Sequence, residues 1–241
     1  MADLDIDWQR PWLAGYRDLP DPGQLRFVPA DRKPPGENYE VFVLRTGTVP
    51  TRDNLHDFFN ARVWCRFPLA KQRMNAHHVD ELGAARPGQG TRGPLRDALT
   101  VFDENGAVLH APPELWDALL LRDWRRLFVD QRPLWRQARL TLVGHALLEQ
   151  LAVAPRKPLT AHVLCAPAPP DEAALDAWLA GQLQDADRLR GKPFTPLPVL
   201  GVPGWCEENA NFSFYDDSIV FRPRRAPENN IRQGHSATGT A

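Results

Sequence analysis

Long apolar runs and cysteine are both scarce in this 241-residue chain. No apolar stretch approaches the roughly 18 residues that a membrane-spanning helix needs. The N-terminal residues have neither the basic start nor the apolar run of a secretory signal. The three cysteines stand far apart in the sequence, which argues against a disulfide framework and against a cysteine zinc site. We therefore expect a cytoplasmic protein without a membrane partner.

An excess of charge of one sign is also missing. Lysine and arginine number 29 against 30 aspartates and glutamates, so the chain lacks the overall basic surface of a general nucleic-acid binder, although a local basic groove stays open. Only four of the 29 basic residues are lysine. A GC-rich bacterial genome explains this bias towards arginine, and selection for two-pronged contacts with anions is the alternative.

Proline and tryptophan, by contrast, are plentiful. The chain has 24 prolines and eight tryptophans, while its hydrophobic (43%) and charged (24%) fractions are ordinary for a globular protein. Prolines together with large aromatic side chains indicate long ordered loops packed onto a core. We expect an irregular N-terminal arm over residues 1–38, a single globular domain over 39–223 and a disordered tail over 224–241.

Helical spacing is clearest in the first half of the domain. The segment Thr51–Asn54 offers side chains that can cap a helix, and an apolar stripe that includes Leu55, Phe59 and Val63 follows it. We expect this helix to end before Pro68, because the residue before a proline disfavours helical geometry. A second helix is predicted over residues 70–82.

The second half alternates between strand and helix patterns. The sequence predicts strands over 138–143 and 159–165, each followed by a helix. Asn105-Gly106 stands between two apolar runs, which predicts a β-hairpin whose first strand covers residues 97–103. The expected fold is therefore α+β, or a small α/β domain, with a short mixed sheet, several helices and long ordered loops rich in proline and glycine.

Several blocks of residues, spread over most of the chain, carry a family resemblance. The blocks are Thr51–Ala61 with Trp64 and Asn75, Arg96–Thr100 with Phe102–Glu104, Gly144–Ala146 with Glu149, Thr160–His162, Pro196–Trp205 and Phe214–Asp217. In these blocks the chain resembles the bacterial family catalogued as domain of unknown function 3025, over roughly residues 40–223. The resemblance implies a bacterial protein and brings no activity with it. Cys206 stands where the family leads us to expect an aromatic residue, which argues against an obligatory base-stacking surface there.

Two histidines stand four residues before a polar partner on predicted helices. His56 and Asn60 lie at the edge of the apolar stripe, where His56 is a candidate metal ligand or general base and Asn60 would orient a substrate or a neighbouring side chain. His145 and Glu149 form the second pair, on a helix that begins where a strand ends. A histidine and a carboxylate at this spacing can hold one divalent ion, or act as a base and its orienting acid. The structural alternatives are a histidine at the edge of the core and a solvated His–Glu contact.

Further candidate ligands lie on predicted strands. His162 would approach His145 if its strand lies beside the strand that precedes His145, and is otherwise a polar group of the core. Cys165 would fall on the opposite face of the same strand. Asp97 and Asp103 would share one face of the predicted hairpin strand, where they either add carboxylates to a cation site or have a structural role at the hairpin.

An anion site is the remaining possibility. The glycine-rich loop that contains Arg92, followed by Arg96, could present backbone N–H groups and guanidinium groups to a phosphate, although it lacks the Gly-Lys-Ser/Thr ending of a Walker loop. Trp205 lies in an aromatic segment that is a candidate stacking platform, the alternative being a loop that seals the core.

Three hypotheses follow from these residues. The first is a divalent-metal-dependent hydrolase that acts on a phosphate ester or a nucleotide. In it His56, Asn60 and His145 are catalytic, Arg92, Arg96 and Trp205 bind the substrate, and the metal ligands are His145, Glu149, His162 and Asp97. The second is a non-catalytic protein that binds RNA or another anionic partner. The third assigns all these polar residues a structural role in a scaffold protein.

Overall fold

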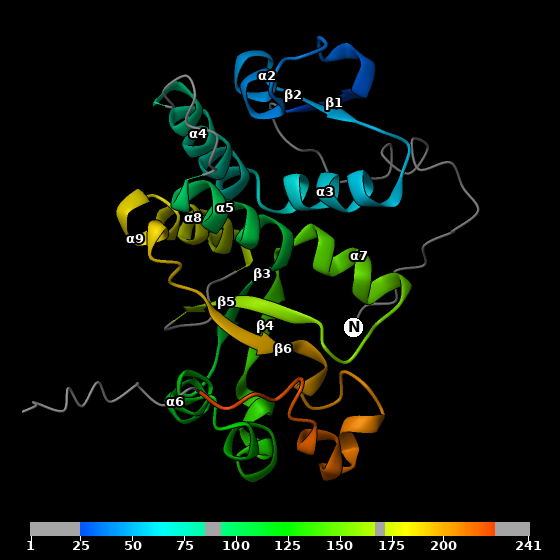
Figure 1. The fold of residues 1–241 in the computed structure, drawn as a ribbon, viewed down its shortest axis with the longest axis vertical. Helices are drawn as coiled ribbons and strands as arrows, with labels where there is room; N and C mark the ends of the chain where they lie inside the picture. The colour runs from blue at the N-terminus through cyan, green and yellow to red at the C-terminus, as the bar shows by residue number, and fades with distance from the viewer. Residues whose placement is uncertain (1–24, 85–92, 167–171, 225–241) are drawn as a thin grey trace, which may run out of the picture.

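The computed structural model describes residues 25–84, 93–166 and 172–224, which fold as one α+β domain (Figure 1). The predicted class is confirmed, with two small sheets in place of one. The helices are α2 (Tyr39–Thr46), α3 (Leu55–Arg66), α4 (Pro68–Ala84), α5 (Pro94–Asn105), α6 (Pro113–Leu121), α7 (His145–Val153), α8 (Glu172–Gln182) and α9 (Ala186–Arg190). The strands are β1 (Arg26–Pro29), β2 (Thr48–Thr51), β3 (Gly106–His110), β4 (Arg139–Leu142), β5 (Thr160–Ala166) and β6 (Thr195–Pro198). Across the described ranges, no helix combines the length and hydropathy needed to cross a bilayer.

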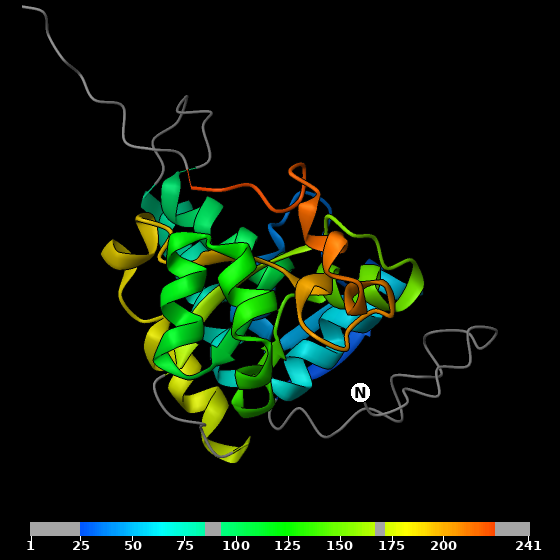
Figure 2. The same ribbon diagram turned by 90° about the horizontal axis from the view of Figure 1, so that it is seen from below.

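The four-stranded sheet divides the domain into two layers. Its order is β4-β3-β5-β6, with β3 and β5 parallel and the outer strands antiparallel to them. Alternate residues of a strand face opposite sides, so Leu109 and Val163 enter one hydrophobic core while Val108 and Leu164 enter the other. Helices α3, α4, α5, α7 and α8 lie above the sheet in Figure 1, and α6 lies below it with the segment that follows β6, as the view from below in Figure 2 shows.

A second, two-stranded sheet covers the far side of α3. Strands β1 and β2 pair in parallel, and α2 connects them. Residues 26–29 therefore form a strand inside the segment expected to be an irregular arm, because their backbone pairs with residues 48–51. Helix α2 ends at Gly47, whose φ of 65° suits a residue without a side chain. A small core that includes Val43, Val49 and Trp64 holds this unit onto α3.

Helices α3 and α4 follow the predicted boundaries. The side chain of Asn54 accepts a hydrogen bond from the backbone N–H of Asp57, which caps the start of α3, and the helix ends before Pro68 as expected. The first turn of α4 is capped from another helix, because Asp176 of α8 accepts hydrogen bonds from the backbone N–H groups of Leu69 and Ala70.

The predicted β-hairpin was wrong. Residues 97–103 belong to α5, where Leu95, Leu99 and Phe102 are buried at helical spacing. Asn105-Gly106 is the end of this helix rather than a two-residue turn. The apolar stripe outweighs the turn signal here.

This correction changes the geometry of two carboxylates. On a helix, Asp97 and Asp103 are about 120° apart around the axis, so they do not share a face as they would on a strand.

Candidate functional site

Polar side chains from five helices meet above the central sheet, where α3, α4, α5 and α7 converge (Figure 1). The set, here called the polar cluster, consists of Tyr39, His56, Asn60, Lys71, Asp103, His145 and Glu149. Its members come from positions more than a hundred residues apart in the chain, so only the folded structure assembles it.

The two histidines of the polar cluster face each other. Their Nε2 atoms lie 3.1 Å apart, and the rings meet edge to face at 74° with centroids 4.6 Å apart. Behind them, Nδ1 of His145 is 2.8 Å from the backbone carbonyl oxygen of Asp103, and Nδ1 of His56 is 2.9 Å from Oε2 of Glu149. Each ring is thus tethered by one nitrogen and presents the other to its partner.

The acceptors behind the rings assign the ring protons. A carbonyl oxygen and a carboxylate can only accept hydrogen bonds, so both Nδ1 atoms carry hydrogen and donate. The two Nε2 atoms then present lone pairs to each other, which is repulsive unless a cation lies between them. That cation is either a proton or a metal ion.

Burial sets the charge state of His145. Its side chain is only 8% exposed, and this burial lowers its pKa to about 4, with the charge of Asp103 opposing the shift and the charge of Lys71 adding to it. His145 is therefore a neutral imidazole near pH 7. His56, whose side chain is 44% exposed, is the member of the pair that a ligand can reach.

A buried ion pair lies beside the histidines. Lys71 is only 4% exposed, and its Nζ donates to Oδ1 of Asp103 at 2.5 Å and to Oδ1 of Asn60 at 2.8 Å. Burial alone would raise the pKa of Asp103, but the charges of Lys71 and His145 outweigh it and hold that pKa below its ordinary value. The lysine and the carboxylate are therefore both charged, and the pair fixes the residue whose carbonyl orients His145.

Asn60 links this ion pair to a tyrosine. Its Nδ2 donates to the hydroxyl oxygen of Tyr39 at 3.3 Å, and Nε1 of Trp64 donates to the same oxygen at 3.3 Å. Burial raises the pKa of Tyr39 above its ordinary value, so the phenol keeps its proton. Among the described residues no acceptor for that proton lies within hydrogen-bonding distance, which leaves Tyr39 able to donate to a ligand.

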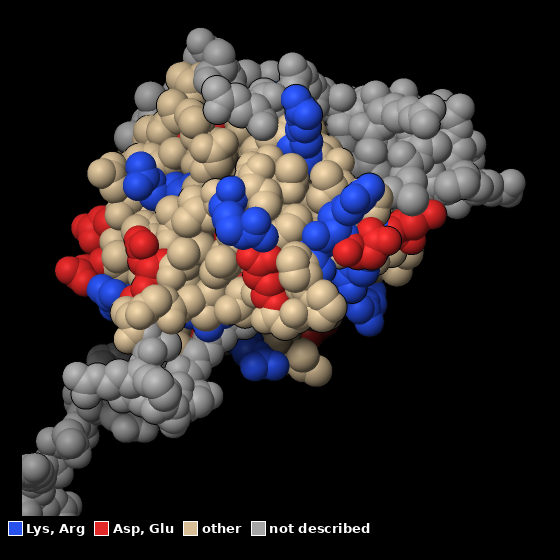
Figure 3. Space-filling view, turned by 90° about the horizontal axis from the view of Figure 1, so that it is seen from above, with Lys and Arg blue, Asp and Glu red and all other residues tan. Residues whose placement is uncertain are grey.

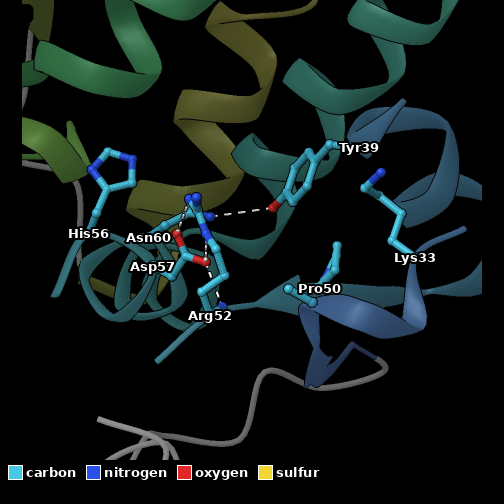
Figure 4. A pocket seen from close by; sticks show the side chains of 8 residues that line it. Lys33, Tyr39, Pro50, Arg52, His56, Asp57 and Asn60 are labelled. Atoms are coloured by element: carbon cyan, nitrogen blue, oxygen red, sulfur yellow. Dashed lines mark hydrogen bonds and ion pairs between the residues drawn. The ribbon is translucent and has the colours of Figure 1, made fainter. Parts of the chain in front are cut away.

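A cavity of about 350 Å³ opens onto the polar cluster between α3 and the small sheet. It is lined by Ala30, Lys33, Tyr39, Pro50, Arg52, His56, Asp57 and Asn60. Figure 4 shows His56 on one side of it, Tyr39 and Lys33 on the other, and Arg52 between them. Arg52 forms a two-pronged pair with Asp57 (3.1 and 2.9 Å), while Lys33 donates to the Glu37 carbonyl at 2.7 Å. Lys33 and Arg52 thus place two cationic side chains in the lining, and guanidinium and ammonium groups are donors that anions favour.

The structure brings five of the residues nominated from the sequence together. These are His56, Asn60, Asp103, His145 and Glu149, which all join the polar cluster. His162 lies on β5, and the strand that precedes His145 is β4, which pairs with β3 instead of β5. Asp97 lies in the first turn of α5. In the part of the chain that the structure describes, no three His, Cys, Asp or Glu side chains are grouped so that they could hold a metal ion.

The residues nominated for anion binding lie elsewhere. Arg92 falls outside the described residues. Arg96 is half-buried in the first turn of α5, and Trp205 packs, also half-buried, against the core below the sheet. Neither lines the cavity.

Sequence reasoning missed Tyr39 and Arg52, and it also missed two lysines. Lys33 and Lys71 make up half of the four lysines in a chain that otherwise uses arginine, and both lie at this site. The rarity of lysine in this sequence could have identified both residues as candidates for the site. The spacing of Lys71, Asn75 and His78 was a second signal, because it places these three buried polar side chains along one face of α4.

Comparison with known proteins gives one match. A family model described as protein of unknown function (DUF3025) matches residues 25–225. No curated protein matches the chain, and no solved structure does.

Proposed function

Because this chain belongs to DUF3025, a family described as of unknown function, its chemistry has to be argued from its own residues, and we propose that it is a hydrolase of small phosphate esters. One observation carries the proposal: a tethered histidine pair borders a cavity lined with cationic side chains. Such a pair can activate a water molecule, and such a cavity can hold the phosphate that the water attacks.

The free energy that it costs to bury the charged groups of the polar cluster supports a catalytic role. Burying a lysine and a carboxylate removes both charges from water, and well-packed apolar residues in their place are often equally stable or more so. Ionisable groups with strongly shifted pKa values in or beside a cavity are candidates for function. Asp103 and His145 both meet this description.

The residues take separate roles in the proposed reaction. The phosphate of the ester binds Arg52 and Lys33, and the hydroxyl group of Tyr39 donates a hydrogen bond to a phosphate oxygen. Glu149 orients His56, and His56 places the attacking water next to the phosphorus atom once its Nε2 turns from His145 towards the cavity. The water oxygen forms a new P–O bond, the ester P–O bond breaks, and the proton that water loses passes through the histidine pair to the departing alcohol oxygen.

Phosphate release from a panel of phosphate mono- and diesters, including nucleoside monophosphates, tests this proposal. We expect the wild-type protein to hydrolyse at least one of them, and His56→Ala to lower kcat by about 10²–10⁴, the usual contribution of a general acid or base. His162→Gln is the matched control and should retain full activity, because its strand does not lie beside the one before His145. A panel without turnover, or an unchanged rate in His56→Ala, would overturn the proposal.

A second candidate function, anion binding without turnover, is favoured by the cavity lining alone. It predicts that inorganic phosphate binds in a salt-sensitive way, that Lys33→Ala weakens the binding, and that His56→Ala leaves it intact. RNA as the anion has less support. On the upper face seen in Figure 3, acidic and basic side chains of the described residues are interspersed and do not form a continuous basic surface.

A further inference from the structure

We propose that His56 and His145 bind one divalent transition-metal ion through their facing Nε2 atoms. The inference deepens the proposed function, on which its role in catalysis rests, by naming the group that would activate the water. Binding itself can be measured without any substrate.

The spacing of the two nitrogens suits a shared ion. With zinc–nitrogen bonds of ~2.05 Å, two nitrogens 3.1 Å apart subtend an angle of roughly 98° at the metal. This value lies between the 90° of an octahedral site and the 109° of a tetrahedral one. Neither ring would need more than a small adjustment to admit the ion.

The tethers behind the rings are those that metal-binding histidines use. A histidine that ligates a metal usually donates its other ring N–H to a carboxylate or a backbone carbonyl, which fixes the tautomer and the ring orientation. Glu149 supplies the carboxylate for His56, and the carbonyl of Asp103 serves His145. Both Nε2 atoms are thereby held facing each other, 3.1 Å apart.

The charge balance also calls for a cation. Lys71 and Asp103 neutralise each other. Within the described residues Glu149 pairs with no lysine or arginine, so the polar cluster carries one negative charge when both histidines are neutral. A divalent ion between the rings would more than offset this charge and would leave one positive charge towards an anionic ligand.

The ligand types restrict the choice of metal. Imidazole nitrogens favour zinc, cobalt, nickel and copper, whereas magnesium and calcium prefer oxygen ligands. Two protein ligands would leave the remaining coordination positions to water and substrate, one open position more than in a catalytic zinc site with three protein ligands. His56 is the half-exposed ligand and borders the cavity, so these open positions are expected on the side where the phosphate binds.

Titration of the chelator-treated full-length chain with Zn²⁺ alone tests the inference, with Co²⁺ as a spectroscopic probe. We expect one equivalent to bind, and His56→Ala and His145→Gln to abolish the calorimetric signal and the Co²⁺ absorption bands. Glu149→Gln should weaken the affinity about 10- to 100-fold, the usual cost of losing a tether behind a metal ligand. The matched control, His162→Gln, should bind like the wild type.

The inference fails if the wild-type protein binds none of these ions, or if binding survives in both histidine variants. The half-exposed His56 provides the decisive variant where His145→Gln does not fold. The outcomes also separate the two proposals. A bound metal with no phosphate-ester turnover overturns only the proposed function, and turnover that persists in chelator with no bound metal overturns only the metal site.

Discussion

The domain has two well-buried regions, one above the central sheet and one below it, and they are built from opposite kinds of contact. Below the sheet, Phe128 is fully buried and stacks with Trp124, Trp135 and Tyr215, while Phe221 meets it edge to face; these five residues are the aromatic cluster. Above the sheet, the polar cluster buries a lysine, two carboxylates and two histidines to different depths.

The buried polar groups of the two regions also differ, in their charge and in their hydrogen-bond partners. Below the sheet the buried polar side chain is neutral Asn209, only 1% exposed, whose Nδ2 donates to the backbone carbonyls of Leu200 and Val202. These bonds hold a loop in place, so the amide serves the fold. Above the sheet Lys71 and Asp103 bind mainly other side chains, in an arrangement that folding does not require. The comparison therefore distinguishes a buried polar side chain that stabilises a loop, Asn209, from the buried charged side chains Lys71 and Asp103, which form part of the candidate site.

One substitution in each region tests whether the two regions contribute separately to stability and to the pKa of His145. Phe128→Ala removes the centre of the aromatic cluster and should cost about 3–5 kcal/mol of unfolding free energy. Lys71→Met leaves Asp103 without its cation and should cost about 3 kcal/mol. Only Lys71→Met should raise the pKa of His145, because the charge of Lys71 helps to lower it. Urea unfolding and NMR titration of the imidazole resonances measure the two effects.

The double variant Lys71→Met/Asp103→Leu provides the control. It removes both buried charges, so it should regain most of the stability that Lys71→Met loses. If Phe128→Ala shifted the pKa of His145 as strongly as Lys71→Met does, the two regions would not be separate and the comparison would fail.

Acid should destabilise the region above the sheet through His145. Burial lowers the folded-state pKa of this histidine from 6.5 to about 4, so between these pH values the unfolded chain binds more protons than the folded one. The free energy of unfolding therefore falls by about 3 kcal/mol as pH drops from above 6.5 to 4. Urea unfolding of the chelator-treated protein at pH 7.5, 5.5 and 4.5 measures this slope.

The same series of unfolding measurements at three pH values also compares the acid sensitivity of the two regions. His145→Gln should lose this part of the acid sensitivity, whereas Phe128→Ala should keep it while starting from a lower stability. Identical slopes for His145→Gln and the wild type would show that the acid sensitivity arises elsewhere.

Local spacing in the sequence predicted half of the polar cluster. His56 with Asn60, and His145 with Glu149, could be identified because four-residue spacing on a helix places side chains on one face. The contacts between these pairs, and those of Lys71 and Asp103, depend on how α3, α4, α5 and α7 pack, which no short window of sequence contains. Asp103 was also assigned to the wrong element, because the Asn105-Gly106 turn signal was given more weight than the apolar stripe of α5.

The smallest change with an effect on the site is the addition of one methyl group at Gly144. A Cβ there would lie 2.4 Å from the carbonyl oxygen of Glu104 and 2.5 Å from the Cα atom of Asn105, so no side chain fits unless α7 moves away from the end of α5. Gly144→Ala should cost about 1–3 kcal/mol of unfolding free energy, as overpacking usually does. It should also weaken Zn²⁺ binding, because the movement separates His145 from the Asp103 carbonyl that orients it.

Gly181→Ala is the matched control, since a Cβ at that position of α8 meets no atom within 4 Å. It should leave Zn²⁺ affinity unchanged and stabilise the helix by up to about 1 kcal/mol, the difference between glycine and alanine in helix propensity. Thermal unfolding and Zn²⁺ titration of both variants complete the test. If Gly144→Ala lost stability but bound Zn²⁺ like the wild type, the contact between α5 and α7 would serve the fold alone, and the region above the sheet would resemble the one below it.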